Sequence, residues 1–257
     1  MKPFMHISTD DIITVFEDLA CHSSTYTSMF DQPLLSFLRD MHLQYGMVHS
    51  GFVFYESADQ AFNLTQVSNQ YTSEFQEHAH WLRWGFHAEN VRSRYESATY
   101  DQAKNDYARI LAELSRITGG AAAIDCVVRT HFYEGNAEAV SAFKDHSEDG
   151  VIGLLSAEDA RLSYDLSAEQ CDELRRYGRI RDQARDLTFY RTDMRLEHVP
   201  DVESQLKLFQ AAEKNLIIFT HEKYLFTEEM KEKIRLCCEF AVGNGYRFGF
   251  PMEEIDY

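Results

Sequence analysis

The 257-residue sequence has few basic residues, few prolines and glycines, and no long hydrophobic run. Lys and Arg number 25 against 42 Asp and Glu, which leaves a formal net charge of −17. Because nucleic-acid binding takes much of its affinity from basic side chains that neutralise phosphates, this charge argues against a nucleic-acid partner. Only 4 Pro and 12 Gly occur, without any linker-like stretch. We therefore expect one domain over residues 1–257.

Membrane and export signals are also lacking. Uninterrupted apolar stretches such as Leu216 to Phe219 fall far below the roughly 20 residues that cross a bilayer, so no membrane partner is expected. Residues Met1 to Asp11 turn acidic and lack the apolar core of a secretory signal. Five cysteines without CxxC or metal-type spacing favour reduced thiols. These features predict a cytoplasmic protein and leave its oligomeric state open.

What the chain does contain is an alternation of short β-like runs with segments of helical spacing. This order is typical of a parallel sheet whose strands are joined by crossover helices. The predicted strands are Phe4 to Thr9, Val48 to Tyr55, His80 to His87, Ala123 to Phe132, Val151 to Leu155, Leu187 to Arg191, Leu216 to Thr220 and Gly245 to Phe250. Seven or eight strands with interleaved helices predict the α/β class and a distorted (β/α) barrel.

Capping signals predict where the helices lie. Thr99-x-x-Gln102 and Ser167-x-x-Gln170 are capping boxes, and Gly119 is placed to end the first of these helices. Further helices are predicted from Pro33 to Gly46, Val202 to Ala212 and Glu228 to Val242. Two polar stretches, Ser57 to Gln76 and Glu134 to Asp149, read as loops that close over a small ligand or, alternatively, pack as short helices on the rim.

Polar residues gather where the predicted strands end. In parallel α/β folds, reactive side chains project from the carboxyl ends of strands. Such residues here are Asp10, Asp11, His87, His131, Tyr133, His221 and Glu222. An Asp-Asp pair alone can equally cap a helix, and a single strand-end histidine is more often structural. Convergence of two aspartates with three histidines favours a cation site with an adjacent base. Arg129 shares one face of its strand with His131 and would join that site.

Three segments resemble motifs of the NodB-type polysaccharide deacetylases. HISTDD at His6 to Asp11 is similar to their first motif, TFDDG. RTHFY at Arg129 to Tyr133 resembles their arginine-containing strand motif, and FTHE at Phe219 to Glu222 resembles their final, histidine-containing one. The segments span essentially the whole chain, although each is degenerate. The resemblance is therefore to the wider glycoside hydrolase/deacetylase superfamily.

That resemblance implies a divalent metal and hydrolysis of an N-acyl group on a sugar. Asp10 would act as base, Asp11 as metal ligand and His221 as acid, while Arg129 would orient Asp10. Zinc is the first candidate for the metal, and Co, Ni, Mn or Fe are also compatible. A small carbohydrate or oligosaccharide would be the substrate.

The sequence departs from the family pattern at three places. Ile12 stands where the family has a glycine, and Val91 stands where it has the second histidine of its metal motif, four residues after His87. His131 occupies the place of a proline after the arginine and would restore the third ligand, as in the YdjC-like branch. The predicted ligand set is Asp11, His87 and His131.

The sequence leaves several alternatives open for the ligand set and for the function. His78 and His80, in HAH, form a second candidate ligand pair. A sugar isomerase or aldolase would need a buried Schiff-base lysine, and Lys223 is the only lysine beside a relevant strand end. A catalytically inactive barrel that binds a glycan or a partner protein is the third interpretation. Aromatic faces for a sugar could come from Trp81, Trp84, Tyr133 and Tyr224, although aromatic residues at strand positions more often belong to the core.

Overall fold

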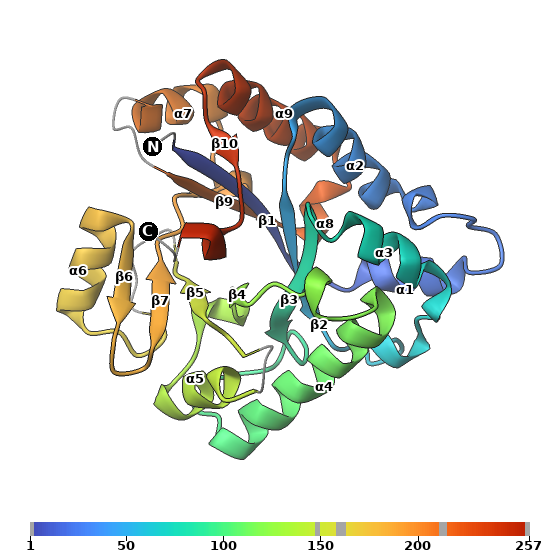
Figure 1. The fold of residues 1–257 in the computed structure, drawn as a ribbon, viewed down its shortest axis with the longest axis horizontal. Helices are drawn as coiled ribbons and strands as arrows, with labels where there is room; N and C mark the ends of the chain where they lie inside the picture. Colours follow the sequence, from blue (N-terminus) through green and yellow to red (C-terminus); the bar gives the residue numbers. More distant parts are fainter. Residues whose placement is uncertain (1–2, 147–149, 158–162, 211–214, 255–257) are drawn as a thin grey trace.

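The computed structural model describes residues 3–146, 150–157, 163–210 and 215–254. Their strands form two sheets with helices packed outside them (Figure 1). The first sheet has the order β3-β2-β1-β9-β8, with β10 also paired to β1, and the second has the order β4-β5-β7-β6. The strands are β1 (Phe4–Ile12), β2 (His49–Phe54), β3 (Leu82–Ala88), β4 (Val127–Val128), β5 (Gly153–Leu155), β6 (Arg179–Asp182), β7 (Leu187–Tyr190), β8 (Met194–Arg195), β9 (Leu216–His221) and β10 (Arg247–Phe248).

The two sheets follow one another as parts of a distorted, open barrel. A parallel bridge between Trp84 and Ile124 joins the β3 edge to the segment that leads into β4. Among the described strands, no pairing closes the ring between β7 and β8. Every pair is parallel except β6 with β7. The predicted α/β class with a parallel, barrel-like sheet is confirmed.

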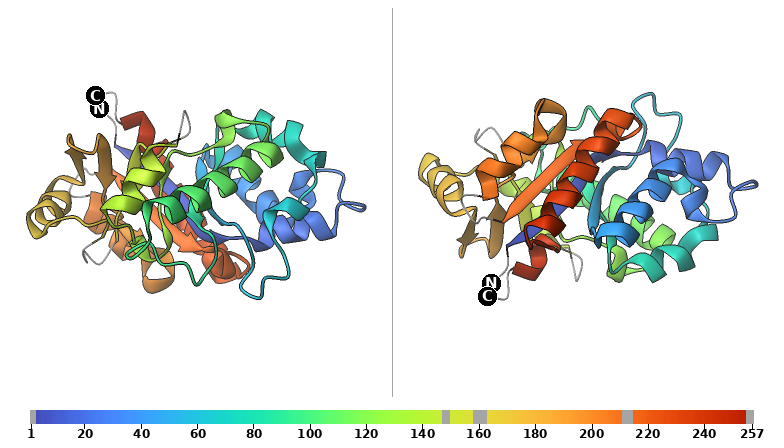
Figure 2. Two further views of the ribbon diagram at one scale, coloured as in Figure 1. Left: turned by 90° about the horizontal axis from the view of Figure 1, so that it is seen from below. Right: turned by 90° about the horizontal axis from the view of Figure 1, so that it is seen from above.

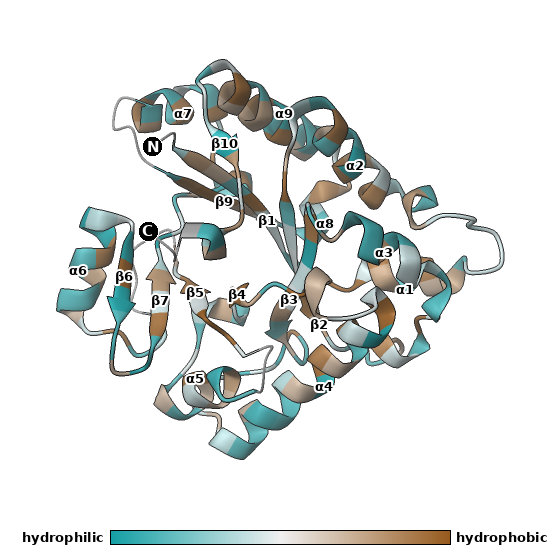
Figure 3. Cartoon of the chain, viewed as in Figure 1, coloured by the Kyte–Doolittle hydropathy of each residue, from teal (hydrophilic) through white to brown (hydrophobic). Residues whose placement is uncertain are grey.

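The helices begin and end largely where the capping signals predict. They are α1 (Thr14–Cys21), α2 (Pro33–Tyr45), α3 (Thr72–His78), α4 (Tyr100–Thr118), α5 (Ala137–Lys144), α6 (Ala168–Tyr177), α7 (Val202–Gln210), α8 (Glu222–Leu225) and α9 (Glu228–Gly243). Thr99 caps α4, Ser167 caps α6 in a full capping box, and Gly119 ends α4 at a φ of 84°. Most helices carry an apolar stripe toward the sheets and a hydrophilic outer face (Figure 3).

No helix in the described part of the chain has both the length and the apolar character needed to cross a bilayer. Ala212, the expected end of the helix that starts at Val202, lies outside the described residues. The described part of α7 runs to Gln210.

Both tryptophans lie in the core, the more frequent position of aromatic residues on strands, so neither is available to pack against a sugar. Each is 1% exposed. The Trp84 ring packs against Phe16 with a centroid distance of 4.9 Å. On the neighbouring strand, Gly51 leaves room for it, because a Cβ atom there would lie 2.7 Å from the indole. Burial of these large rings between the strands and the helices stabilises the fold.

The fourth predicted strand is much shorter than expected. Only Val127 and Val128 pair as β4, and the alternation of faces breaks further on because Phe132 and Tyr133 adopt φ values of 56° and 59°. The predicted loop from Ser57 to Gln76 contains two 3-10 helices and the start of α3, and the second predicted loop contains α5. Short helices therefore occupy both segments.

The amino-terminal end of the barrel is closed by the 3-10 helix Pro251–Glu254, which lies at the same end as the start of β1 (Figure 2). Phe250, just before this helix, is buried and packs under the Arg83 guanidinium at 3.9 Å. The ring of His6 contacts the Gly249 carbonyl oxygen at 3.1 Å. The carboxyl ends of β1, β3 and β9 lie at the opposite end.

Two buried histidines near this closed end predict a loss of stability in acid. Burial lowers the pKa of His6 and of His49 to about 3 from the usual 6.5. The unfolded chain therefore takes up protons that the folded chain cannot, so stability is complete above pH 6.5 and falls as pH drops toward 3. Each histidine should remove about 1.4 kcal/mol per pH unit in that window.

Urea unfolding at pH 7 and pH 5 measures this effect. We expect His49→Gln, which retains an acceptor or donor for the Thr9 hydroxyl, to make stability less dependent on pH. His22→Gln is the control, because that imidazole is exposed. An unchanged slope in His49→Gln would show that His49 is not held neutral.

Candidate metal and catalytic site

The end of β1 places two adjacent aspartates on different sides of the chain. In the pairing of β1 with β9, Asp10 lies opposite His221, so both side chains belong to one level of the barrel. The pairing of β1 with β2 shifts register between Thr9 and Ile12. Within that irregularity, Asp11 adopts a φ of 63°, a left-handed conformation that is uncommon outside glycine, although aspartate adopts it more readily than most residues. This turn directs Asp11 away from its neighbour.

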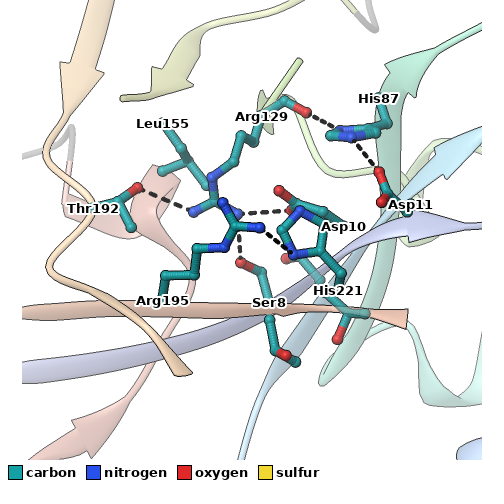
Figure 4. A network of polar contacts seen from close by, with 12 residues as sticks. Ser8, Asp10, Asp11, His87, Arg129, Leu155, Thr192, Arg195 and His221 are labelled. Atoms are coloured by element: carbon teal, nitrogen blue, oxygen red, sulfur yellow. Dashed lines mark hydrogen bonds and ion pairs between the residues drawn. The ribbon is translucent and has the colours of Figure 1, made fainter. Parts of the chain in front are cut away.

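Asp10 and Arg129 form an ion pair inside the barrel. The Arg129 Nη1 atom donates to Asp10 Oδ1 at 2.8 Å and to the Ser8 hydroxyl at 3.1 Å, and Nη2 donates to the Thr192 hydroxyl at 3.1 Å. Figure 4 shows this network from close by. Both charged side chains are buried, and the guanidinium lies 4.1 Å from the centroid of the Phe219 ring. The predicted contact between Arg129 and Asp10 is present.

Asp11, His87 and His131 bring three ligand-type atoms together. Oδ1 of Asp11 lies 3.1 Å from Nε2 of His87 and 3.5 Å from Nδ1 of His131. The two imidazole nitrogens lie 3.3 Å apart. His87 uses its other nitrogen, Nδ1, to donate to the Arg129 carbonyl at 2.6 Å. In neutral His87 this bond places the proton on Nδ1, so Nε2 would offer its lone pair to an ion bound beside Asp11.

The electrostatics of these three residues suit a cation. Burial opposes ionisation of Asp11, yet the hydrogen bonds from His131 and His87 outweigh it and hold the pKa of Asp11 well below its usual range. Burial also disfavours the charged form of His87, but the Asp11 carboxylate raises its pKa overall. For His131, burial prevails and the pKa is lowered. A carboxylate that stays charged beside a neutral imidazole is a ready ligand pair.

His221 is held by a carboxylate that sequence reasoning missed. Its Nδ1 atom contacts Oε1 of Glu197, and the Thr220 hydroxyl donates to Oε2 of Glu197 at 3.0 Å. Burial disfavours the charge on Glu197, but the bond with His221 lowers its pKa to about 2. Arg195 donates to the same carboxylate at 2.9 Å. The two-residue strand β8 that carries Arg195 is too short to show a β pattern in the sequence.

Other candidates from the sequence lie elsewhere. Val91 is 41% exposed and is not among the ligand-type residues that converge, so His131 takes the third position beside Asp11 and His87. His80 is exposed and precedes β3, away from the carboxyl end of that strand. Lys223 is exposed as well. Within the described residues, Asp11, His87 and His131 are the one group of three His, Cys, Asp or Glu side chains compact enough to hold an ion.

A cavity of about 450 Å³ is lined by Phe132 and the residues that follow it, and Asp11, His87 and His131 are not part of its lining. The ring of Phe132, which is 43% exposed and lines the cavity, is centred 3.9 Å from the ring of His131. The Arg94 guanidinium covers Phe132 at 4.0 Å. Four lining residues adopt positive φ, namely Phe132, Tyr133, Tyr164 and Asp165. Such conformations carry a cost and cluster at functional sites in many proteins.

The fold is similar to that of solved family 4 carbohydrate esterases. An acetyl xylan esterase of that family from Clostridium thermocellum, in complex with a cobalt ion, matches with a TM-score of 0.56 at 11% identity, over 97% of this chain and 89% of that chain. The CE4 domain of a multidomain xylanase from the hindgut metagenome of Trinervitermes trinervoides matches with a TM-score of 0.54 at 11% identity, over 100% and 91%.

A CE4 family pseudoenzyme from Bacillus anthracis also matches, with a TM-score of 0.51 at 8% identity, over 98% of this chain and 65% of that chain. No protein-family model and no curated protein matches the sequence. Because the identities are so low, these likenesses concern the fold. The polysaccharide deacetylase resemblance indicated by the three motifs is thus confirmed for the fold.

Because Asp10 and Arg129 are buried together, loss of one partner alone should destabilise the protein more than loss of both charges. Arg129→Met should lower the free energy of unfolding by about 3–5 kcal/mol, because it leaves the Asp10 carboxylate buried without its partner. Adding Asp10→Asn should recover part of that loss. Urea unfolding of the single and double variants measures both changes.

Arg94→Met is the matched control. Arg94 also pairs with a carboxylate at 2.7 Å, that of Glu134, but its side chain is 51% exposed. Its loss should cost less than about 1 kcal/mol. Equal effects of Arg94→Met and Arg129→Met would contradict the distinction between the buried pair and the exposed one.

Proposed function

We propose that this protein is a metal-dependent hydrolase that removes an N-acetyl group from a small carbohydrate or oligosaccharide. The observation that carries the proposal is the convergence of Asp11, His87 and His131 beside the Asp10–Arg129 pair. The fold likeness to family 4 carbohydrate esterases supports the same reaction class. One chain, residues 1–257 as a single domain, would hold the whole site.

The three donors fit a divalent transition metal. Ligands about 2.0–2.1 Å from a tetrahedral ion lie about 3.3–3.4 Å from one another. The distances among the Asp11 oxygen and the two imidazole nitrogens, 3.1, 3.3 and 3.5 Å, are close to that spacing. One carboxylate with two imidazoles suits zinc first, and also cobalt, nickel, manganese or iron. A cobalt ion accompanies one esterase of similar fold.

When bound, such an ion supplies Lewis acidity toward a substrate carbonyl and toward water. The residues of this chain supply the proton transfers. Asp10 accepts a proton from the attacking water, and Arg129, which bonds to its Oδ1 atom, fixes the carboxylate for that task. His221 donates a proton to the leaving amine, while Glu197 holds its Nδ1 side and leaves Nε2 for the substrate.

The cavity that Phe132 lines, next in sequence to His131, supports a sugar as the substrate. Its volume of about 450 Å³ falls within the range of small-molecule sites. Phe132 offers a partly exposed aromatic ring next to His131, and such a ring can pack against the apolar face of a pyranose. In this assignment, the N-acyl group lies on the side of Phe132 that faces His131, and another part of the sugar lies in the cavity on the other side of Phe132.

A binding function without catalysis is the second candidate. One solved structure of similar fold is a pseudoenzyme, and Val91 replaces the second histidine of the family's metal motif. The isomerase or aldolase alternative loses support, because Lys223 is exposed and a Schiff-base lysine needs burial to lower its pKa.

Metal content tests the ligand set. Protein purified without chelator should contain about one transition-metal ion per chain, and His131→Ala should lose it because only two donors remain. Elemental analysis measures both. His80→Ala removes an exposed histidine of HAH and should keep the metal. Full metal retention in His131→Ala would remove His131 from the site, and loss in His80→Ala would place the ion elsewhere.

Acetate release tests the reaction. With added divalent metals, the protein should release acetate from N-acetylated monosaccharides or short oligosaccharides. Asp10→Asn, whose amide oxygen still accepts from Arg129, should stay folded with a lower free energy of unfolding and keep the metal, while the rate falls by at least about 100-fold because the general base is lost. Asp59→Asn, which changes an exposed aspartate, should be unaffected.

The substrate panel also separates the two candidate functions. Release only from insoluble polymers would refute the preference for a small substrate. Release from none of the substrates, together with measurable binding of the oligosaccharides, would favour the glycan-binding candidate. Normal turnover by Asp10→Asn would show that the assigned base is wrong.

A further inference from the structure

Glu222 is a buried carboxylate that the proposed reaction does not use. It follows His221 directly, begins α8, and is 3% exposed. Its Oε2 atom accepts from the backbone N–H groups of Ile13 at 3.1 Å and Thr14 at 2.9 Å, and its Oε1 atom accepts from that of Val15 at 2.8 Å. All three donors belong to the first turn of α1. One side chain therefore ties the end of β9 to the turn that leaves β1.

The sequence around α1 provides no local cap for this helix. The N-cap residue is Ile13, whose side chain accepts no hydrogen bond. Free N–H groups at a helix start need acceptors, and a carboxylate also interacts favourably with the positive end of the helix dipole. Burial raises the pKa of Glu222, and the three N–H donors oppose that effect by stabilising the charged form. Glu222, which lies 207 to 209 residues away in sequence, thus caps α1.

The turn that Glu222 holds lies next to Asp11, the proposed metal ligand with a left-handed backbone conformation. Only Ile12 separates Asp11 from Ile13, and Asp11 keeps its φ of 63° although the family's glycine is not present at the following position. A left-handed aspartate persists only where its surroundings hold it. On the β9 side, His221 lies opposite Asp10 in the register. Glu222 therefore connects the end of β9, which carries His221, to the end of β1, which carries Asp10 and Asp11.

We propose that Glu222 is a positioning residue, which holds Asp11 in the conformation that faces His87 and sets the distance between the β1 and β9 ends of the site. It does not touch the substrate or the ion. In its metal-affinity part, this inference rests on the proposed function. In its structural part, it concerns the contact of 3.1 Å between Asp11 and His87.

The test uses Glu222→Gln, which retains the shape of the side chain but replaces one acceptor and the charge. Isothermal titration with Zn²⁺ should show affinity reduced about 10- to 100-fold, the usual consequence of losing a residue that supports a metal ligand. Ser167→Ala is the matched control, since Ser167 caps α6 by accepting from Gln170 at 3.2 Å. It should lower the melting temperature without changing Zn²⁺ affinity.

A second variant separates positioning from simple helix capping. Ile13→Ser in the Glu222→Gln background supplies a local cap to α1 but does not restore the tie to β9. We expect it to recover the melting temperature and not the Zn²⁺ affinity. Recovery of both would show that Glu222 acts only as a cap, which would overturn the proposal. This better-capped variant also serves if Glu222→Gln alone folds poorly.

A crystal structure of metal-free Glu222→Gln distinguishes failure of this proposal from failure of the proposed function. If Asp11 leaves its left-handed conformation and its contact with His87 lengthens, Glu222 positions Asp11 whether or not the wild-type protein binds Zn²⁺. If Asp11 is unmoved, the proposal is wrong even when wild-type protein binds the ion. Absence of Zn²⁺ binding by wild-type protein would instead refute the metal assignment.

Discussion

Arg129 is the residue on which the arrangement of the site depends most. Its guanidinium bonds to Asp10, and its own backbone carbonyl accepts from His87. One residue thus sets the orientation of the predicted base and of one predicted ligand, which come from β1 and β3. A charge this deeply buried is tolerable only because its hydrogen bonds and the Asp10 carboxylate compensate for lost hydration. Displacement of Arg129 would therefore disturb both at once.

The closed end of the barrel complements this arrangement. Phe250 and the helix Pro251–Glu254 seal the amino-terminal end, where His6 and His49 are kept neutral by burial. Asp125, also buried there, accepts from the Ser50 hydroxyl and from the Val127 N–H, the latter at 2.9 Å. Each of these histidines has one hydrogen-bond partner within the protein, while His6 Nε2 and His49 Nδ1 are buried without a partner among the described residues. Charged groups with capacity for a ligand are concentrated at the carboxyl ends of β1, β3 and β9.

The departures from the deacetylase pattern compensate for one another in space. Val91, where the family pattern has its second histidine, is exposed and offers no ligand atom. The third donor comes instead from the segment after β4. There the left-handed residues Phe132 and Tyr133 interrupt the strand and leave His131 beside Asp11. With His131 in that place, the proposed site would have one carboxylate and two imidazoles.

Sequence patterns by themselves determined the fold class, most helix ends and the level of the barrel at which the chemistry lies. These features are local: Thr99, Ser167 and Gly119 act on their own helices, and carboxyl ends of parallel strands meet at one edge. The candidates Asp10, Asp11, His87, Arg129, His131 and His221 followed from that placement and from the family resemblance.

Tertiary structure alone decided how these residues are held. Glu197 reaches His221, and Glu222 reaches α1, across more than 20 and more than 200 residues respectively, and no periodicity relates such positions. The true length of β4 was equally hidden, because backbone conformations at Phe132 and Tyr133 depend on the packing around them. The burial of Trp81 and Trp84 followed the same rule, since an aromatic residue on a strand faces core or ligand according to neighbours supplied by other strands and helices.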